Sequence, residues 1–277
     1  DGRRARQQAE TTSFRQACKV REGAGHGFQE TDSMDEYQLK NFLKFAPARL
    51  GLVPKKHLLV HIPKNGGMSV RHAKALEGNL VLANRRRLKS KAYANALMTF
   101  MRDRGLHPGY EHARLRDIDL SVRAGTVPFA VVRNPWARTF SRFKFYLQTS
   151  GSHEAEFDLT VKGFEEFLET RHEWGKVDFF WHRASLGWYP QSDYVIDERG
   201  QVAVNILRQE KLGPELARYL GADDTLEQRN ISRNARADQR KFYTDRNIEI
   251  VADWYKTEIE LFGFDFDTPA TRNVFFS

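Results

Sequence analysis

The stretch that decides the fold is LLVHIPKNGGMS, residues 58–69. Its apolar start predicts a strand over residues 58–60, the Pro-Lys-x-Gly-Gly segment predicts a tight turn, and Ser69 is expected to open a helix. A turn of this kind points successive backbone N–H groups at one place, which is how proteins hold phosphate. Lys64 adds a mobile positive charge beside it. The segment therefore predicts an anion-binding strand–turn–helix unit.

A second stretch, FAVVRNPWARTFS at residues 129–141, has the same order of elements. After a short apolar strand, Asn134 and Pro135 supply a capping residue and a proline suited to the first helical position. One helix face is then apolar, at Trp136, Phe140, Phe143 and Leu147. Arg133 ends the strand and Ser141 lies off the apolar stripe, so these two side chains are predicted to bind a second phosphate group.

The order of elements along the chain predicts an α/β fold, a P-loop-like parallel β-sheet flanked by helices, with the ligand at the carboxyl ends of the strands. A further helix is predicted over residues 90–104, and another over residues 244–263 with Thr244 as its cap and Gly263 as its stop. Residues 149–189 mix aromatic and charged side chains without clean periodicity, which predicts irregular segments around a cleft.

Composition predicts one catalytic domain over residues 51–277, preceded by a poorly ordered arm over residues 1–50, where apolar periodicity is almost absent at the start. The 44 Lys and Arg against 36 Asp and Glu give a net charge of +8, which favours anionic partners such as a nucleotide, an acidic acceptor or nucleic acid. The basic run at residues 85–89 is expected to be a solvated approach to the next helix rather than an acceptor contact.

The single cysteine, Cys18, excludes an intramolecular disulfide and any cysteine-based zinc site, which favours a reducing, cytoplasmic compartment. No segment reaches the length of an apolar membrane span, and residues 1–29 lack the apolar core of a signal peptide. Because the chain begins with Asp, an upstream anchor or leader stays open as an alternative. The oligomeric state also stays open.

The two stretches together resemble the nucleotide signatures of carbohydrate-type sulfotransferases, H-I-P-K-T-G-G-T-S and V-R-N-P-x-x-R-x-x-S, and bacterial members of the family in particular. These enzymes use 3′-phosphoadenosine 5′-phosphosulfate (PAPS). The second signature matches at every specified position, and the first departs at Asn65 and Met68, where the family usually has threonine. Residues 189–194 resemble its P-Q-x-x-Y segment, residues 204–212 its R-x-E-x-L strand, and residues 243–266 its C-terminal stretch. The resemblance covers residues 55–267.

The resemblance implies a sulfotransferase fold and a PAPS-dependent sulfotransferase. Such an enzyme moves a sulfuryl group from PAPS to an acceptor hydroxyl, expected on a carbohydrate, and yields the product 3′-phosphoadenosine 5′-phosphate (PAP) without a metal. The implied nucleotide-binding residues are Lys64, Asn65, Gly66, Gly67, Met68, Ser69, Arg133, Ser141 and Arg233. Lys64 is also expected to be catalytic, as the electrostatic partner of the leaving group. Met68 has no hydroxyl to give to a phosphate, so the geometry there is expected to differ.

His112 is the predicted general base. It lies between the two phosphate motifs, resembles a histidine of the bacterial family members, and an ordinary imidazole accepts a proton near neutral pH. His182, beside Trp181, is the alternative base. His61 is predicted to be structural because it belongs to the segment that leads into the turn.

Three other functions are alternatives to sulfuryl transfer. A nucleotide kinase is disfavoured because the chain lacks G-x-x-x-x-G-K-[ST]. A nucleic-acid-binding module agrees with the pI of about 9.5, but the basic residues are dispersed and no RNA-recognition or zinc-finger pattern is present. A non-catalytic relative that binds the nucleotide or a polyanion stays open because of Met68.

Overall fold

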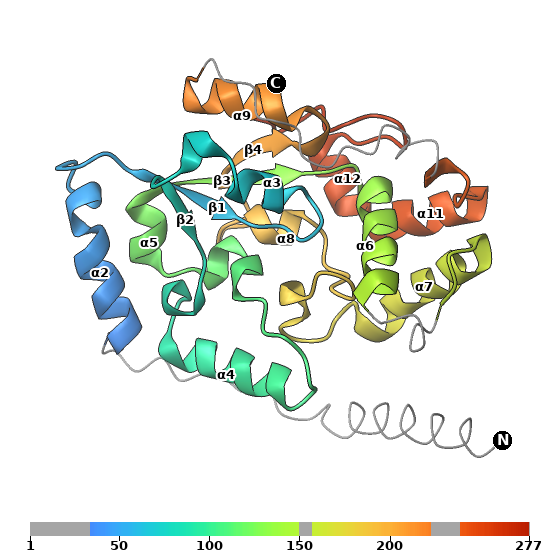
Figure 1. The fold of residues 1–277 in the computed structure, drawn as a ribbon, viewed down its shortest axis with the longest axis horizontal. Helices are drawn as coiled ribbons and strands as arrows, with labels where there is room; N and C mark the ends of the chain where they lie inside the picture. Colours follow the sequence, from blue (N-terminus) through green and yellow to red (C-terminus); the bar gives the residue numbers. More distant parts are fainter. Residues whose placement is uncertain (1–33, 150–156, 223–238, 277) are drawn as a thin grey trace. The chain divides into compact units, whose positions relative to one another are not determined.

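Four parallel strands form the sheet of this protein, in the order β2-β1-β3-β4 (Figure 1). They are β1 Lys56–Val60, β2 Leu80–Leu82, β3 Thr126–Val132 and β4 Asn205–Arg208. The structure is a computed structural model that describes residues 34–149, 157–222 and 239–276. The predicted α/β architecture, with a parallel sheet flanked by helices, is confirmed.

The connections leave β1 and β3 toward opposite edges of the sheet. From β1 the chain passes through α3 (Gly67–Arg71) to β2 on one side, and from β3 it passes through α6 (Pro135–Thr149) toward β4 on the other. The two strands are direct neighbours, with Val60 opposite Ala130. The crevice at their carboxyl ends is therefore the topological switch point, where open α/β sheets bind ligands.

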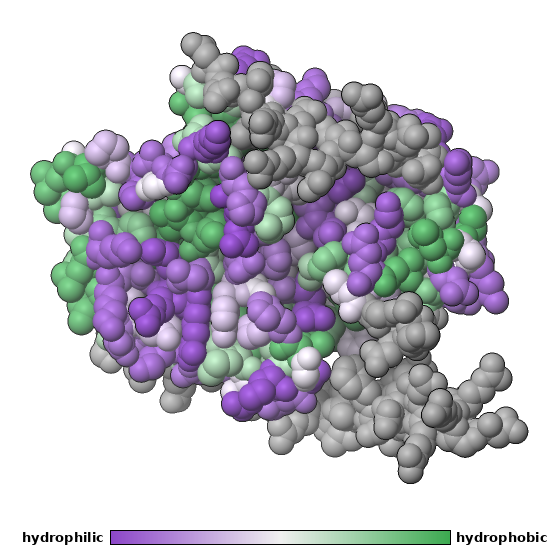
Figure 2. Space-filling model, viewed as in Figure 1, coloured by the Kyte–Doolittle hydropathy of each residue, from purple (hydrophilic) through white to green (hydrophobic). Residues whose placement is uncertain are grey.

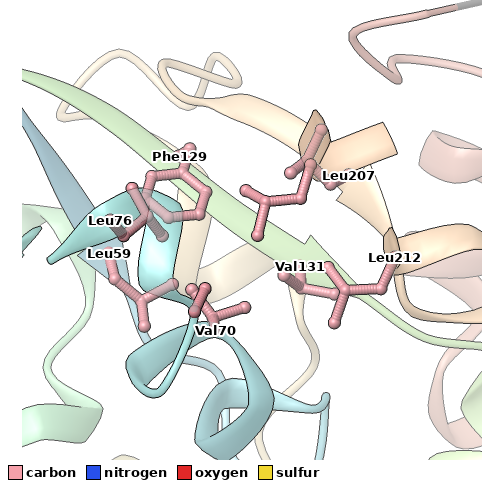
Figure 3. Packing of buried hydrophobic residues seen from close by; sticks show 9 residues of the cluster. Leu59, Val70, Leu76, Phe129, Val131, Leu207 and Leu212 are labelled. Atoms are coloured by element: carbon pink, nitrogen blue, oxygen red, sulfur yellow. The ribbon is translucent and has the colours of Figure 1, made fainter. Parts of the chain in front are cut away.

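One face of the sheet is sealed by α3 and α9 (Leu212–Leu220). Alternate residues of a strand point to the same face, so Leu59, Phe129, Val131 and Leu207 meet Val70 of α3 and Leu212 of α9 in one buried cluster (Figure 3). This packing fixes α3, and with it the turn before α3, against the end of β1.

The remaining helices surround this core (Figure 1). They are α2 Glu36–Arg49, α4 Lys91–Arg102, α5 Leu120–Ala124, α7 Val161–Trp174, α8 Ser192–Val195, α11 Asp245–Trp254 and α12 Lys256–Phe262. Short 3₁₀ turns lie between them, at η1 Lys74–Leu76, η2 Arg85–Arg87, η3 Tyr110–His112, η4 Leu115–Asp117, η5 Phe180–His182 and η6 Gln209–Lys211. No helix in the described part of the chain is long and apolar enough to cross a membrane.

Several predicted helix ends are confirmed by their caps. The Asn134 carboxamide oxygen accepts from the N–H groups of Trp136 (3.1 Å) and Ala137 (3.2 Å) at the start of α6. Ser90 caps α4 and Thr244 caps α11 in the same way. Gly263 ends α12 with a φ of +64°, a left-handed conformation that favours glycine.

The helix predicted over residues 244–263 is two helices, because the chain departs from helical geometry at Tyr255. The Tyr255 side chain is buried, and its hydroxyl accepts a hydrogen bond from Arg142 Nη1 on α6 at 2.7 Å. Tertiary contacts at this point outweigh the helical periodicity of the sequence.

Three further predictions are corrected. The arm predicted to be poorly ordered up to residue 50 contains the helix α2. This helix starts with a capping box of Asp35 and Gln38, and it buries Phe45 and Ala48. Residues 1–33 of the predicted arm lie outside the described residues. The segment predicted to be irregular contains α7, whose apolar face is buried. The first predicted helix begins at Gly67, two residues before Ser69.

Candidate functional site

The turn after β1 depends on two glycines. Gly66 has a φ of +80°, which an L side chain rarely adopts. Gly67 lies against the imidazole of His61, so a Cβ at that position would overlap the ring. Among the described residues no acceptor is found for the backbone N–H groups of Gly66, Gly67 and Met68. Three adjacent donors are thus open to an anionic ligand.

Lys64 is a desolvated cation in this turn. Its Nζ lies 3.9 Å from the ring centroid of Phe145 on α6. Burial, and secondarily the positive charge of Arg133, lower the pKa of Lys64 to about 8. A bound anion would reverse this shift, because it would stabilise the ammonium form. The electrostatics of the turn therefore favour an anionic ligand.

Arg133 joins the second phosphate motif to the first. It follows β3 directly, and its Nη1 donates to the Lys64 carbonyl oxygen at 3.1 Å. Its Nε is buried and has no protein partner among the described residues. Burial lowers the pKa of Arg133, but a guanidinium keeps its charge. No hydrogen bond from its Nη2 to a described residue is found, so the group is a cation with donor capacity left for a ligand.

Two neighbours of Arg133 on α6 have different roles. Arg138 is buried and donates from Nε to the Pro63 carbonyl oxygen at 3.3 Å and from Nη1 to that of Tyr189 at 3.1 Å. Arg138 therefore helps to fix the turn after β1. Ser141 is half-buried, and no hydrogen bond of its hydroxyl to another described residue is found, so this hydroxyl is free for a ligand.

The Asn65 side chain, predicted as a nucleotide ligand, is part of the scaffold. It is buried, and its Nδ2 donates to the Val131 carbonyl oxygen (2.8 Å) and to Gln191 Oε1 (2.5 Å). These bonds fix the turn to β3. Asn65 therefore approaches a ligand only with its backbone.

Gln191 holds both motifs together and was missed as a site residue. Its Oε1 accepts from the Arg133 backbone N–H and its Nε2 donates to the Arg133 carbonyl oxygen, both at 2.8 Å. Its backbone N–H and its Nε2 also donate to the carboxylate of Glu258 on α12. Gln191 belongs to the YPQSDY stretch that the resemblance singled out, whereas Glu258, in a charged helix, gave no signal.

Glu258 is a buried carboxyl group behind this network. Burial raises its pKa to about 7, against the opposing effects of Arg138 and of the hydrogen bonds from Gln191. Near neutral pH the group is thus divided between its protonated and ionised forms. The hydrogen-bond network that holds Arg133 therefore contains a carboxyl group that titrates near neutral pH.

One of the two ring nitrogens of His112 is bonded within the protein. Its Nδ1 lies 3.1 Å from the His61 carbonyl oxygen, so Nδ1 carries the proton and donates, and Nε2 keeps its lone pair. No partner for Nε2 is found in the described ranges. Burial lowers the pKa of His112 below its usual value, which keeps the ring neutral. The rings of His112 and His61 are 4.4 Å apart, so His112 lies beside the residue that underlies Gly67.

His61 and His182 occupy buried positions. Burial lowers the pKa of His61 well below its usual value, and its ring packs under the turn, as expected for a structural residue. His182 Nδ1 donates to the Gly109 carbonyl oxygen at 3.0 Å, and burial lowers its pKa to about 4. Its Nε2 is buried without a partner among the described residues. His182 therefore supports the turn before His112, and the geometry favours His112 as the proton acceptor.

The described site residues thus converge on the switch point from the ends of β1 and β3 and from η3. Met68 and Ser69 lie on α3, where Met68 is 57% exposed and Ser69 is half-buried. Arg233 lies outside the described residues. This arrangement is able to bind an anion with two cations and three N–H groups and to accept a proton at His112 Nε2.

Comparison of the chain with protein-family models, with curated proteins and with solved structures finds no match.

Proposed function

We propose that this protein transfers a sulfuryl group from PAPS to an acceptor hydroxyl and releases PAP and a sulfate ester. The observation that carries the proposal is the hydrogen bond from Arg133 Nη1 to the Lys64 carbonyl oxygen at 3.1 Å. It joins the two PAPS-like motifs at the switch point of the sheet. PAPS has phosphate groups at both ends of its ribose, and the two motifs supply one cation for each.

The residues divide the binding between them. The N–H groups of Gly66, Gly67 and Met68, together with Lys64, would hold the 5′ phosphosulfate. The Arg133 guanidinium and the Ser141 hydroxyl would hold the 3′-phosphate, with Arg233 as a further expected ligand. When bound, PAPS supplies the sulfuryl group, and its leaving phosphate oxygen gains negative charge, which Lys64 is suited to stabilise.

His112 is the group suited to take the acceptor proton. Its Nε2 lone pair is free, and the bond from Nδ1 to the His61 carbonyl oxygen (3.1 Å) fixes the orientation of the ring. The new bond joins the acceptor oxygen to sulfur, the bond from sulfur to the leaving phosphate oxygen breaks with its electron pair on that oxygen, and the proton goes to His112. A carbohydrate hydroxyl is the acceptor that the sequence resemblance favours.

Ligand-induced thermal stabilisation tests the binding half of this proposal. PAP at a hundred times its Kd should stabilise the folded protein by about 2.7 kcal/mol. AMP, magnesium ATP, heparin and duplex DNA should each give less. A larger effect of magnesium ATP would favour a kinase, and a larger effect of heparin or DNA would favour a polyanion-binding protein.

Transfer of labelled sulfate from PAPS to a panel of carbohydrate, phenol, peptide and lipid acceptors tests the chemical half. Binding of PAP without transfer to any acceptor class would favour a non-catalytic relative. Arg133→Ala should weaken the binding of PAP more than that of AMP, and the two losses of binding free energy should differ by about 1.5 to 3 kcal/mol. AMP serves as the reference because Arg133 also holds the Lys64 carbonyl oxygen, so both ligands lose some affinity. The matched control is Arg102→Ala, an exposed arginine at the end of α4.

A further inference from the structure

Helix α2 has two opposite faces. Asn41, Phe45 and Ala48 are buried against the rest of the domain. The opposite face is also apolar, although it is exposed, and the loop after the helix continues it. This exposed set, called here the α2 apolar surface, consists of Leu39, Phe42, Leu43, Leu50, Leu52 and Val53. The four members on the helix and at its end recur at helical spacing and occupy roughly 100° of its circumference.

The clustering of these side chains is the unusual feature. Of the twelve large apolar side chains that are exposed among the described residues, seven lie between Met34 and Val53. Leu50 and Leu52 are each 73% exposed. Figure 2 shows hydrophobic surface at the left of the molecule, where Figure 1 places the loop after α2. Single exposed leucines are ordinary, but a cluster of this kind on one helix face and the loop after it points to a site of interaction.

The rim of this surface is basic. Exposed cations lie along α2 and on the loop that follows it, at Lys40, Lys44, Arg49, Lys55 and Lys56. Of the acidic residues at the start of α2, Asp35 caps the helix and Glu36 pairs with Lys40 (2.5 Å) and Lys91 (3.0 Å).

This charge pattern selects the class of partner. A second copy of the chain, paired through the same patch, would bring like cations together around the contact, which opposes association. An anionic bilayer satisfies both features, because Leu and Phe side chains enter the boundary between headgroups and acyl chains while Lys and Arg meet the lipid phosphates. We propose that the α2 apolar surface docks on an anionic membrane surface.

Docking of the α2 apolar surface on a membrane is compatible with access of a ligand to the switch point. The surface adjoins the start of β1 at Lys56, whereas the turn that carries Lys64 follows the other end of the strand. The proposal does not depend on the sulfotransferase function, because its readout is lipid binding.

Vesicle cosedimentation tests this inference with the full chain. The protein should bind vesicles of phosphatidylcholine with about a third phosphatidylserine, and should bind pure phosphatidylcholine vesicles much more weakly. Leu43→Ser should lower the partition coefficient on anionic vesicles about tenfold, and Lys44→Ala about fivefold. The matched controls are Leu159→Ser and Lys176→Ala, since Leu159 is 57% exposed against 63% for Leu43 and Lys176 is an exposed lysine away from α2.

All four substitutions are at exposed positions, so thermal unfolding should be unchanged and a loss of binding is not a loss of folding. Equal binding to neutral and anionic vesicles, no binding, or wild-type binding by Leu43→Ser would each overturn the proposal. Sedimentation velocity without lipid tests the alternative that a second copy of the chain binds to the α2 apolar surface. A dimer that Leu43→Ser dissociates, in a protein that binds no vesicles, would make the α2 apolar surface a subunit interface instead.

Discussion

Protonation of Lys64 should be coupled to nucleotide binding. Burial and the charge of Arg133 lower the pKa of Lys64 to about 8, so about half of the free protein carries a neutral Lys64 at pH 8. A bound phosphate would raise this pKa again, and PAP would then bind together with a proton. The uptake expected from Lys64 is about a tenth of a proton at pH 7, about half a proton at pH 8 and close to one proton at pH 9. The Kd for PAP should rise about tenfold between pH 7 and pH 9, a range in which its phosphates do not titrate.

Calorimetry in two buffers of different ionisation enthalpy measures this uptake directly. Lys64→Met should bind PAP weakly at every pH and without the uptake. Lys64→Arg should keep much of the affinity and also lose the uptake, because a guanidinium stays charged at pH 9. The reasoning fails if Lys64→Met takes up as many protons as the wild type, or if the wild-type Kd is flat from pH 7 to pH 9.

Three further substitutions probe the site and its support. His112→Gln should reduce sulfuryl transfer by roughly two to four orders of magnitude and leave PAP affinity unchanged in calorimetry, whereas the exposed His172→Gln should change neither. Gly67→Ala should lower the free energy of unfolding by about 1–3 kcal/mol in urea denaturation, because its Cβ overlaps the His61 ring. Burial raises the pKa of Glu258 to about 7, so its contribution to stability is present below about pH 4.5 and is lost as the pH rises through 7. In urea titrations at several pH values, Glu258→Gln should remove up to about 3 kcal/mol of this pH dependence of the free energy of unfolding. An equal pH dependence in the variant and the wild type would refute the assignment.

The features that the sequence predicted well are local ones. The caps of α4, α6 and α11 each join a side chain to an N–H group two or three residues away, as between Asn134 and Trp136. The turn after β1 is also local, since glycine adopts the positive φ of Gly66 without the steric cost that other residues would have. Such contacts are present in a short window of sequence, so the spacing of residue types predicts them.

The features that the sequence did not predict depend on distant contacts. Asn65 is turned inward because Gln191, 126 positions away, offers it an acceptor. The helix of residues 244–263 is divided at Tyr255, whose hydroxyl bonds to Arg142. The helix α2 gave little signal because both of its faces are partly apolar and the polar start of the chain precedes it. In each case tertiary packing outweighs the local pattern.

Two arginines on neighbouring segments differ in how far their guanidinium groups are bonded within the protein. Arg142 on α6 donates from Nε and Nη2 to the Ser185 carbonyl oxygen and from Nη1 to Tyr255, so each of its three nitrogens is bonded within the protein. Arg133 is half-buried, its Nη1 bonds to the Lys64 carbonyl oxygen, and its Nε and Nη2 have no partner among the described residues. An unpaired donor of this kind lowers stability, and the scaffold around it, anchored by Gln191 on both sides of the Arg133 peptide, holds it in position. The protein therefore bonds every nitrogen of the Arg142 guanidinium internally, whereas the Arg133 guanidinium is the one that we propose for an anion at the switch point.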